Sequence, residues 1–264
     1  MIDRGALKRF PAARLPKRLI RTLAQTNAQY GLIGEGDRVM LGLSGGKDSL
    51  ALAHLLVRMQ RIAPFDFELL AVTVDYGMGE DLSGVAAHCA EYGIPHHIEK
   101  SDIFATAADR IRPNSSFCSY FSRMRRGVLY STAKRLGYGT LALAHHLDDA
   151  AESFFMNLFY NGKLRAMAPI YRSEEHDIRV IRPLIKAREE QMSAFVVENG
   201  FEPIGDEACP AMQLPVKMPH ARAETKVWLK ALETQRPELF KHLENGFENL
   251  NAESFFDETY LKRV

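Results

Sequence analysis

The sequence has few cysteines, no long apolar run and no low-complexity tract, and each scarcity excludes a class of protein. Its 264 residues include only three cysteines, Cys89, Cys118 and Cys209, too few for a disulfide scaffold or a four-cysteine zinc module. No window approaches the ~18 uninterrupted apolar residues of a membrane-spanning helix. The N-terminus lacks the apolar core of a secretory signal, so we expect a cytoplasmic protein without a membrane anchor.

Charge is distributed unevenly along a chain whose net charge is only +1. Residues 1–21 hold seven basic residues against one acid, residues 122–135 are basic without an acid, and the segment 233–258 is acidic. Two basic segments in a near-neutral protein predict local patches for a polyanion. The alternative for each segment taken alone is a solvated helix face.

The most informative motif is Ser44-Gly45-Gly46-Lys47-Asp48-Ser49, which follows the apolar run 39–43 and precedes an amphipathic stretch. This pattern predicts a strand, a loop and a helix. Glycines let backbone N–H groups approach an anion, the helix N-terminus favours negative charge, and Lys47 adds a full positive charge. The motif therefore predicts a phosphate cradle. The alternative is a serine–glycine turn that merely caps a helix.

The loop differs from the Walker pattern, because leucine stands at position 41 and Asp48 follows Lys47. A carboxylate inside a phosphate cradle repels phosphate unless a cation lies between them, so Asp48 implies Mg²⁺. A second acidic pair, Asp148 and Asp149, follows two histidines after the apolar run 140–144. These carboxylates can hold Mg²⁺ through water, or they can simply cap a helix.

Strand and helix patterns alternate through residues 39–200, and the strand segments are apolar throughout. Such alternation is typical of a parallel sheet covered on both faces, so we predict an α/β, Rossmann-like, doubly wound fold with helical extensions at both ends. Strands are expected at 39–43, 67–74, 95–98, 140–144 and 180–185. Helices are expected at 16–30, 47–61, 80–92, 124–137, 148–160 and 187–199, with two more in the tail.

The polar motifs all follow strand ends in this scheme. Ligands of open parallel sheets bind beyond the carboxyl ends of the strands, near the point where the strand order reverses. The loop 44–49, Asp75 and residues 145–149 should therefore converge on one cleft.

These residues also resemble known families. Ser-Gly-Gly-Lys-Asp-Ser after a strand resembles the loop of the ATP pyrophosphatases, whose fold is that of the adenine nucleotide alpha hydrolases. The His-His-Leu-Asp-Asp segment at 145–149 narrows the resemblance to the tRNA-modifying branch. Together with segments 123–130, 157–164 and 181–184, it resembles the tRNA 2-thiocytidine synthetases in order and spacing, over about residues 16–213.

The resemblance implies an enzyme that uses ATP to adenylate a carbonyl of a cytidine in the tRNA anticodon loop and replaces the oxygen by sulfur. By position, Ser44–Ser49, Asp75, His146 and Asp149 would bind ATP. Mg²⁺ would be held by Asp48, Asp148 and Asp149, and Lys47 and Asp149 would act in catalysis. The side chains implied for RNA binding are Lys17, Arg18, Arg21, Arg123, Arg125 and Arg126. A sulfur donor protein and a homodimer are implied as further partners.

The cysteine pattern of this sequence differs from that of the family it resembles. Its members hold a [4Fe–4S] cluster with three cysteines, and Cys118 matches the first position while Cys209 lies near the third. Phe121 occupies the second position and cannot ligate iron. Cys89 is expected in a helix core. Three interpretations stay open: a cluster despite Phe121, a persulfide carrier and a resolving thiol at Cys118 and Cys209, or two relic cysteines.

Two alternative functions remain at this stage. One is amine ligation as in lysidine synthetase, which needs no cysteine, and the other is a non-catalytic ATP- or RNA-binding protein that has lost the sulfur chemistry. Release of pyrophosphate with tRNA would separate the enzymes from the binding protein. We divide the chain into a basic helical extension (1–36), an ATP pyrophosphatase domain (37–213) and a helical tail (214–264) packed on that domain.

Overall fold

The computed structural model describes residues 4–7, 9–110, 117–203 and 220–260. The chain divides into two compact units, and each is described by itself. The first unit comprises residues 1–146 and 168–219, and the second comprises residues 147–167 and 220–264. The segment 147–167, which lies within the central domain of our sequence-based division, therefore groups with the C-terminal helices.

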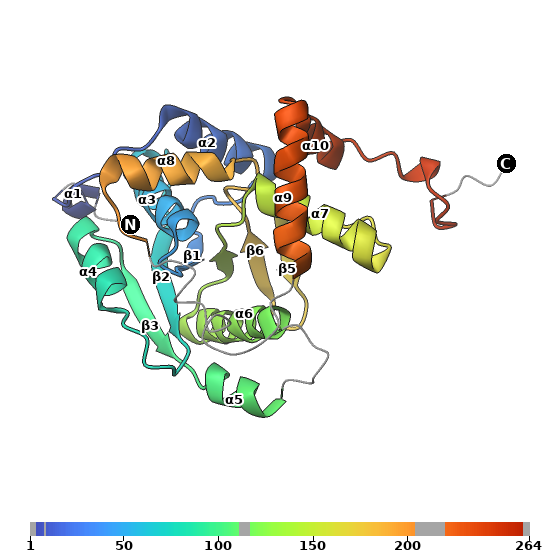
Figure 1. The fold of residues 1–264 in the computed structure, drawn as a ribbon. Coiled ribbons are helices and arrows are strands. Elements are labelled where there is room, and N and C mark those ends of the chain that lie inside the picture. Colours follow the sequence, from blue (N-terminus) through green and yellow to red (C-terminus); the bar gives the residue numbers. More distant parts are fainter. Residues whose placement is uncertain (1–3, 8, 111–116, 204–219, 261–264) are drawn as a thin grey trace. The chain divides into compact units, whose positions relative to one another are not determined.

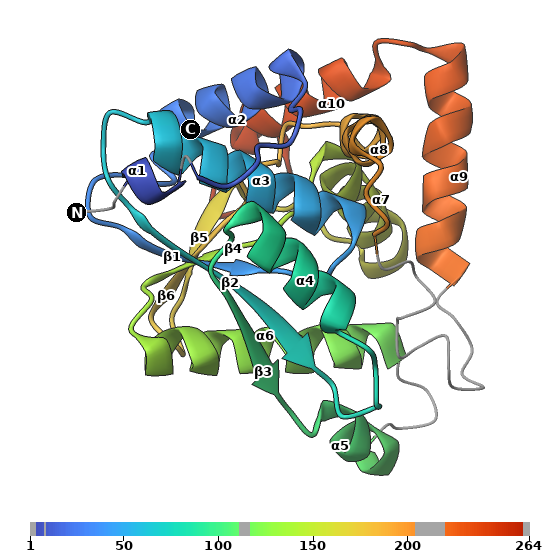
Figure 2. The ribbon, with the colours of Figure 1, turned by 90° about the vertical axis from the view of Figure 1, so that its left-hand side faces the viewer.

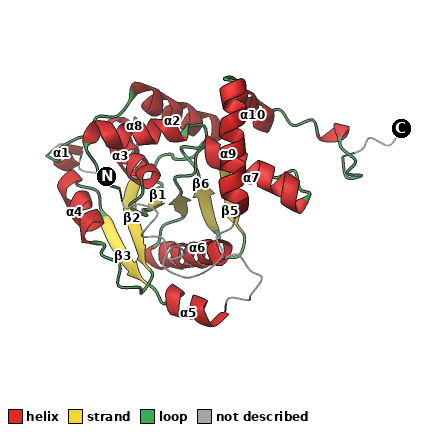
Figure 3. Ribbon diagram, in the orientation of Figure 1, coloured by secondary structure: helices red, strands yellow, loops and turns green. Residues whose placement is uncertain are grey.

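The first unit contains the sheet (Figures 1 and 3). Its strands are β1 (Arg38–Gly42), β2 (Glu68–Asp75), β3 (His96–Lys100), β4 (Thr140–Ala142), β5 (Ile170–Ser173) and β6 (Ile178–Ile181). Its helices are α1 (Arg4–Leu7), α2 (Lys17–Tyr30), α3 (Lys47–Ile62), α4 (Ser83–Tyr92), α5 (Ile103–Arg110), α6 (Phe117–Leu136) and α8 (Glu189–Asn199). Gly200 ends α8 with a φ of 64°, as its position after the helical pattern predicted.

The strand order is β3-β2-β1-β4-β6-β5. The first five strands in this order pair in parallel, which confirms the doubly wound fold, and the order reverses between β1 and β4. The sheet is not wholly parallel, because β5 pairs with β6 in the antiparallel sense. The sequence analysis missed β5 and α5, since each is short and irregular in its apolar spacing.

Two apolar layers cover the faces of this sheet (Figure 2). One layer joins the strands to α2, α3, α4 and α8, and it includes Leu19, Leu52 and Phe195. The other layer joins them to α5 and α6, and it includes Met40, Leu129 and Val180. Burial on both faces explains why the central strands β1, β2 and β4 are mostly apolar. The expectation that every strand is apolar was wrong for β3 and β5, which lie at the sheet edges, are only partly buried and carry polar residues.

The second unit contains α7 (Leu147–Asn161), α9 (His220–Gln235), α10 (Leu239–Glu248) and a short 3₁₀ helix, η3 (Ala252–Ser254). Its apolar core comprises Leu147, Ala151, Leu229 and Phe240. The two tail helices expected from the sequence are thus present. Among the described residues, no helix combines the length and the hydropathy needed to span a membrane.

Candidate active site

The loop 44–49 joins β1 to α3 and is closed by its own serines. Ser49 Oγ donates to the Gly46 carbonyl at 2.9 Å, and the Ser44 backbone N–H donates to Ser49 Oγ at 3.2 Å. Gly45 has a φ of 83°, which L-residues rarely adopt, while Gly46 is extended and caps α3. The predicted strand, loop and helix are present, and the first N–H groups of α3 follow the loop directly.

Lys47 lies between two carboxylates. Its Nζ is 3.0 Å from Glu189 Oε1, at the start of α8, and 3.4 Å from Asp48 Oδ2. Burial acts to lower the pKa of Lys47, but these carboxylates outweigh burial and hold the pKa above its ordinary value. Lys47 is therefore a fixed cation in the loop. Sequence reasoning missed Glu189, because it lies 142 residues away and belongs to no phosphate motif.

The loop after β4 reaches the phosphate loop through His146. This side chain is buried, and its Nε2 lies 3.9 Å from Asp48 Oδ2. Its neighbour His145 accepts a hydrogen bond at Nδ1 from Arg182 Nε, at 3.4 Å. Within the first unit, the carboxyl ends of β1, β4 and β6 thus present interacting polar groups.

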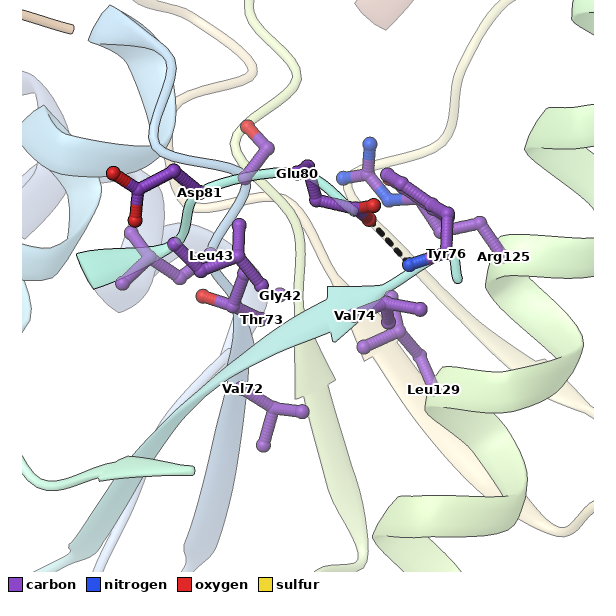
Figure 4. A pocket seen from close by; sticks show the side chains of 12 residues that line it. Gly42, Leu43, Val72, Thr73, Val74, Tyr76, Glu80, Asp81, Arg125 and Leu129 are labelled. Carbon is purple, nitrogen blue, oxygen red and sulfur yellow. Dashed lines mark hydrogen bonds between the residues drawn. The ribbon is translucent and has the colours of Figure 1, made fainter. Parts of the chain in front are cut away.

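A cavity of about 230 Å³ lies beside the loop, at the carboxyl ends of β1 and β2 (Figure 4). Its walls include Ser44, the strand residues 72–74, Glu80, and Arg125 and Leu129 of α6. Glu80 accepts hydrogen bonds from the backbone N–H groups of Tyr76 and Met78, at 2.5 and 2.9 Å, which holds the rim in place. The cavity offers apolar walls with a few polar groups, as sites for small molecules do.

Asp75 and Arg125 lie at the carboxyl ends of β1 and β2, one at the turn after β2 and the other in the cavity wall. Asp75 Oδ1 accepts the N–H of Gly77 at 2.9 Å, so this side chain shapes the turn, and the neighbouring Tyr76 lines the cavity. Arg125 also lines the cavity, whereas Arg123 and Arg126 are exposed on the same helix. Lys17, Arg18 and Arg21 are exposed on α2.

Asp148 and Asp149 belong to the first turn of α7 in the second unit. Arg222 of α9 binds this helix, because its Nη2 donates to Asp149 Oδ1 at 2.5 Å and its Nε donates to Glu152 Oε2 at 2.8 Å. Burial raises the pKa of Glu152, and Arg222 opposes that shift. The sequence offered no signal for Arg222, since it lies in the tail beyond the recognised motifs.

The described part of the chain shows no metal centre formed by the cysteines. Cys209 lies outside the described residues, as does the side chain of Cys118. Phe121 is buried in the α6 layer, with its ring 5.2 Å from that of Tyr76. Cys89 lies in the apolar core, as expected, and burial raises the pKa of its thiol to about 12. In the described part of the chain, no three His, Cys, Asp or Glu residues are grouped to hold a metal ion.

Comparison with known proteins identifies the family. A model of the PP-loop domain matches residues 16–213. The tRNA-cytidine(32) 2-sulfurtransferase of Geobacter sulfurreducens is 37% identical over 242 residues, covering 91% of this chain and 93% of that protein. The protein of the same name from Syntrophotalea carbinolica is 41% identical over 192 residues, covering 72% of this chain and 74% of that protein.

A solved structure shares the fold. The U34-tRNA thiolase NcsA from Methanococcus maripaludis, described with its [4Fe–4S] cluster, matches with a TM-score of 0.71 and 23% identity. The match covers 94% of this chain and 85% of that one. The resemblance read from the motifs is thereby confirmed. The chain belongs to the PP-loop domain family and, within it, to the family of the tRNA-cytidine(32) 2-sulfurtransferases.

Proposed function

We propose that this chain is an ATP-dependent tRNA sulfurtransferase that exchanges the C2 carbonyl oxygen of cytidine 32 for sulfur. The observation that carries the proposal is the glycine-serine loop after β1, beside a cavity at the carboxyl ends of β1 and β2, in a chain of this family. The carbonyl oxygen attacks the α-phosphorus of ATP, and pyrophosphate leaves. A sulfur nucleophile then attacks C2, and AMP leaves with the original oxygen.

The first step is needed because the oxygen of an amide-like carbonyl is a poor leaving group. The backbone N–H groups after Gly45 and the hydroxyls of Ser44 and Ser49 would cradle the phosphates. Lys47 would stabilise the charge that develops on the leaving pyrophosphate. The adenine and ribose would occupy the cavity along residues 72–74, with Arg125 near the phosphates. Asp75 would contact the nucleotide from the rim, where its Oδ1 already accepts the Gly77 N–H.

Mg²⁺ is the metal that suits this donor set, because carboxylates and phosphates are its usual ligands. When bound, it would screen the charge of the triphosphate. Asp48, Asp148 and Asp149 are the residues proposed to hold it, and His146 would orient Asp48. Because Asp149 Oδ1 already accepts from Arg222, Asp149 would ligate through its other oxygen or after Arg222 moves away.

The residues present do not fit a [4Fe–4S] cluster held by three thiolates. Phe121 places a buried ring where the family has a thiolate, and Cys89 lies in the apolar core. We therefore propose that sulfur reaches the adenylated base as hydrosulfide, or as a persulfide on one of Cys118 and Cys209. In the second route the other thiol then breaks the S–S bond to the base, which leaves a disulfide between the two cysteines. No step of the proposed mechanism passes through a cluster.

The substrate would bind along the exposed basic side chains of α2 and α6, which include Lys17, Arg18, Arg21, Arg123 and Arg126. A base must leave its stack to reach a cleft of this kind, and an anticodon loop offers unpaired bases. We also propose a cytoplasmic location, a sulfur donor protein as a partner, and a homodimer.

The test is mass analysis of unmodified tRNA after incubation with the protein, ATP, Mg²⁺ and sulfide. We expect one oxygen-to-sulfur exchange at cytidine 32 and release of pyrophosphate, both absent from a Lys47→Ala variant. In a parallel incubation with an amine in place of sulfide, addition of that amine to the base would favour ligation of the lysidine type. ATP binding without pyrophosphate release would show a protein that has kept the fold and lost the chemistry.

A further inference from the structure

The arginines of the first unit differ in their partners according to the edge of the sheet at which they lie. Near the amino-terminal ends of the strands, Arg38 pairs with Glu68 and Arg179 pairs with Asp37. Close to them, in the β5–β6 hairpin, Arg172 pairs with Asp177. These arginines surround a polar cavity of about 430 Å³, but carboxylates already neutralise each of them. Each of these three arginines is therefore already paired and is not left over for an anionic ligand.

The carboxyl edge is different. Arg182 follows β6 directly, and only 7% of its surface is exposed. Among the residues that the structure describes, no carboxylate lies within ion-pair distance of it. Arg123, Arg125 and Arg126 of α6 also have no acidic partner in the described part of the chain. A buried cation without a counter-charge is costly, and it is retained where a function requires it.

Arg182 is held by neutral groups. Its Nη1 donates to the Ala168 carbonyl at 2.5 Å, and its Nε donates to His145 Nδ1 at 3.4 Å. Its guanidinium carbon lies 5.1 Å from the centre of the Tyr171 ring. These contacts fix the orientation of the guanidinium but supply no negative charge.

Two tyrosine hydroxyls lie beside this cation. Tyr130 OH and Tyr171 OH are 3.0 Å apart, and burial raises the pKa of Tyr130, which keeps that hydroxyl a neutral donor. Arg126 lies one turn before Tyr130 on α6 and is exposed. Two cations and two hydroxyls are therefore gathered at one place, which is the donor set that binds phosphate.

The place of this cluster in the sheet separates it from the nucleotide. The cavity and the loop 44–49 lie at β2 and β1, whereas Arg182 lies at the end of β6, two strands beyond β1. Strands are spaced by about 4.8 Å, so the cluster is roughly 10 Å from the end of β1. The cluster is therefore set apart from the loop that would cradle the phosphates of ATP, and separate titrations of tRNA and ATP decide which of the two it binds.

We propose that Arg182, Arg126, Tyr130 and Tyr171 form a second phosphate subsite, which receives a backbone phosphodiester of the substrate RNA near the target base. This inference rests on the proposed function, because it takes tRNA as the substrate. Arg182 and the loop 44–49 then hold two different phosphates on opposite sides of the strand-order reversal. The target base would lie between them, next to the histidines after β4.

The experiment compares Arg182→Gln, Arg182→Lys and Arg126→Gln with the unaltered protein, using unmodified tRNA and ATP in separate equilibrium titrations. Arg135→Gln is the matched control, because Arg135 lies on the same helix, is exposed and already pairs with Glu99. We expect Arg182→Gln to weaken tRNA binding about ten-fold or more, and Arg182→Lys to lose less.

Salt dependence and ATP binding distinguish the outcomes. Arg182→Gln and Arg126→Gln should each lose one phosphate contact. The slope of log K for tRNA binding against log salt concentration should then be smaller in magnitude by about 0.7–0.9 in each variant. The ATP affinity of both variants, and the tRNA binding of the Arg135→Gln control, should be unchanged. An equal loss of ATP affinity would assign the cluster to the nucleotide and overturn the proposal. Unchanged tRNA binding and an unchanged slope in folded Arg182→Gln and Arg126→Gln would show that the cluster is only structural.

Failure of the proposed function would look different. In that case the unaltered protein would not bind tRNA at all, or would bind it without any exchange of oxygen for sulfur. The first result would remove both proposals. The second would leave the phosphate subsite intact and remove only the sulfur chemistry.

Discussion

Gly45→Ala should damage the phosphate loop in a way that Gly46→Ala does not. Gly45 has a φ of 83°, where an L-residue costs about 1–2 kcal/mol, so Gly45→Ala should destabilise the protein by about that amount. Gly46 has a φ of −69° and a ψ of 159°, and a Cβ there would meet Ser44 Oγ at 3.5 Å, an ordinary contact. Alanine is a poorer N-cap residue than glycine, which destabilises the folded Gly46→Ala variant. Alanine also restricts the unfolded chain, which stabilises the variant, and the two effects of about 0.5–1 kcal/mol nearly cancel.

Thermal unfolding of the two variants tests this difference. For a chain of this size, a loss of 1–2 kcal/mol corresponds to a fall in Tm of about 2–8 °C, whereas Gly46→Ala should stay within about 2 °C of the unaltered protein. Because the strained loop relaxes by turning its N–H groups, Gly45→Ala should also weaken ATP binding by about ten-fold or more. Equal Tm shifts in the two variants would refute the argument from backbone conformation.

Three other predictions concern buried titratable groups and the cysteines. Burial, His88 and Arg61 lower the pKa of His54 from 6.5 to about 3 in the folded protein. Between pH 6.5 and pH 3 the unfolded chain therefore binds one more proton at this residue than the folded chain, and the free energy of unfolding falls as the pH falls. In His54→Phe, the slope of the free energy of unfolding against pH, measured by urea titration, should be smaller by up to about 1.4 kcal/mol per pH unit, which corresponds to one proton. An unchanged slope would contradict this prediction. Arg222→Ala should lower the free energy of unfolding by about 1–3 kcal/mol at pH 7, and by less near pH 4. The reason is that the pKa of Glu152 is raised, and its carboxyl group no longer needs a cation once it is protonated. A loss of stability that does not depend on pH would argue against this. Protein reconstituted without oxygen should hold far fewer than the ~4 irons of a full cluster, and iron with acid-labile sulfide near that number would show that Phe121 is tolerated.

The central helices and strands could be predicted from the sequence because their apolar spacing and their flanking glycines are clear. The apolar run before Ser44, the helix that ends at Gly200 and the two helices of the tail were all expected within a few residues of where they lie. The early start of α6 at Phe117 and the strand β5 were missed. Both lack a clean period, and β5 forms only because it pairs with β6.

The chemistry of the phosphate loop was also readable, because an anion cradle requires particular residue types in consecutive positions. The partners that come from distant segments were not. Glu189 on Lys47 and Arg222 on Asp149 come from other helices, and no local spacing marks either of them. Arg182 lay inside a recognised motif, yet nothing in the sequence showed that it is buried without a carboxylate.

The sequence by itself determined the family, the strand–loop–helix unit at residues 44–49 and the phenylalanine at position 121 where the family has a cysteine, since each depends on the identity of neighbouring residues. Tertiary structure decided which charges are neutralised and which are left for a ligand. It paired Arg38, Arg172 and Arg179, near the amino-terminal edge, with acids, and among the described residues it left Arg182, at the carboxyl edge, without one. The physical reason is that electrostatic pairing depends on distance in space, and the folded sheet brings together groups that the chain keeps far apart.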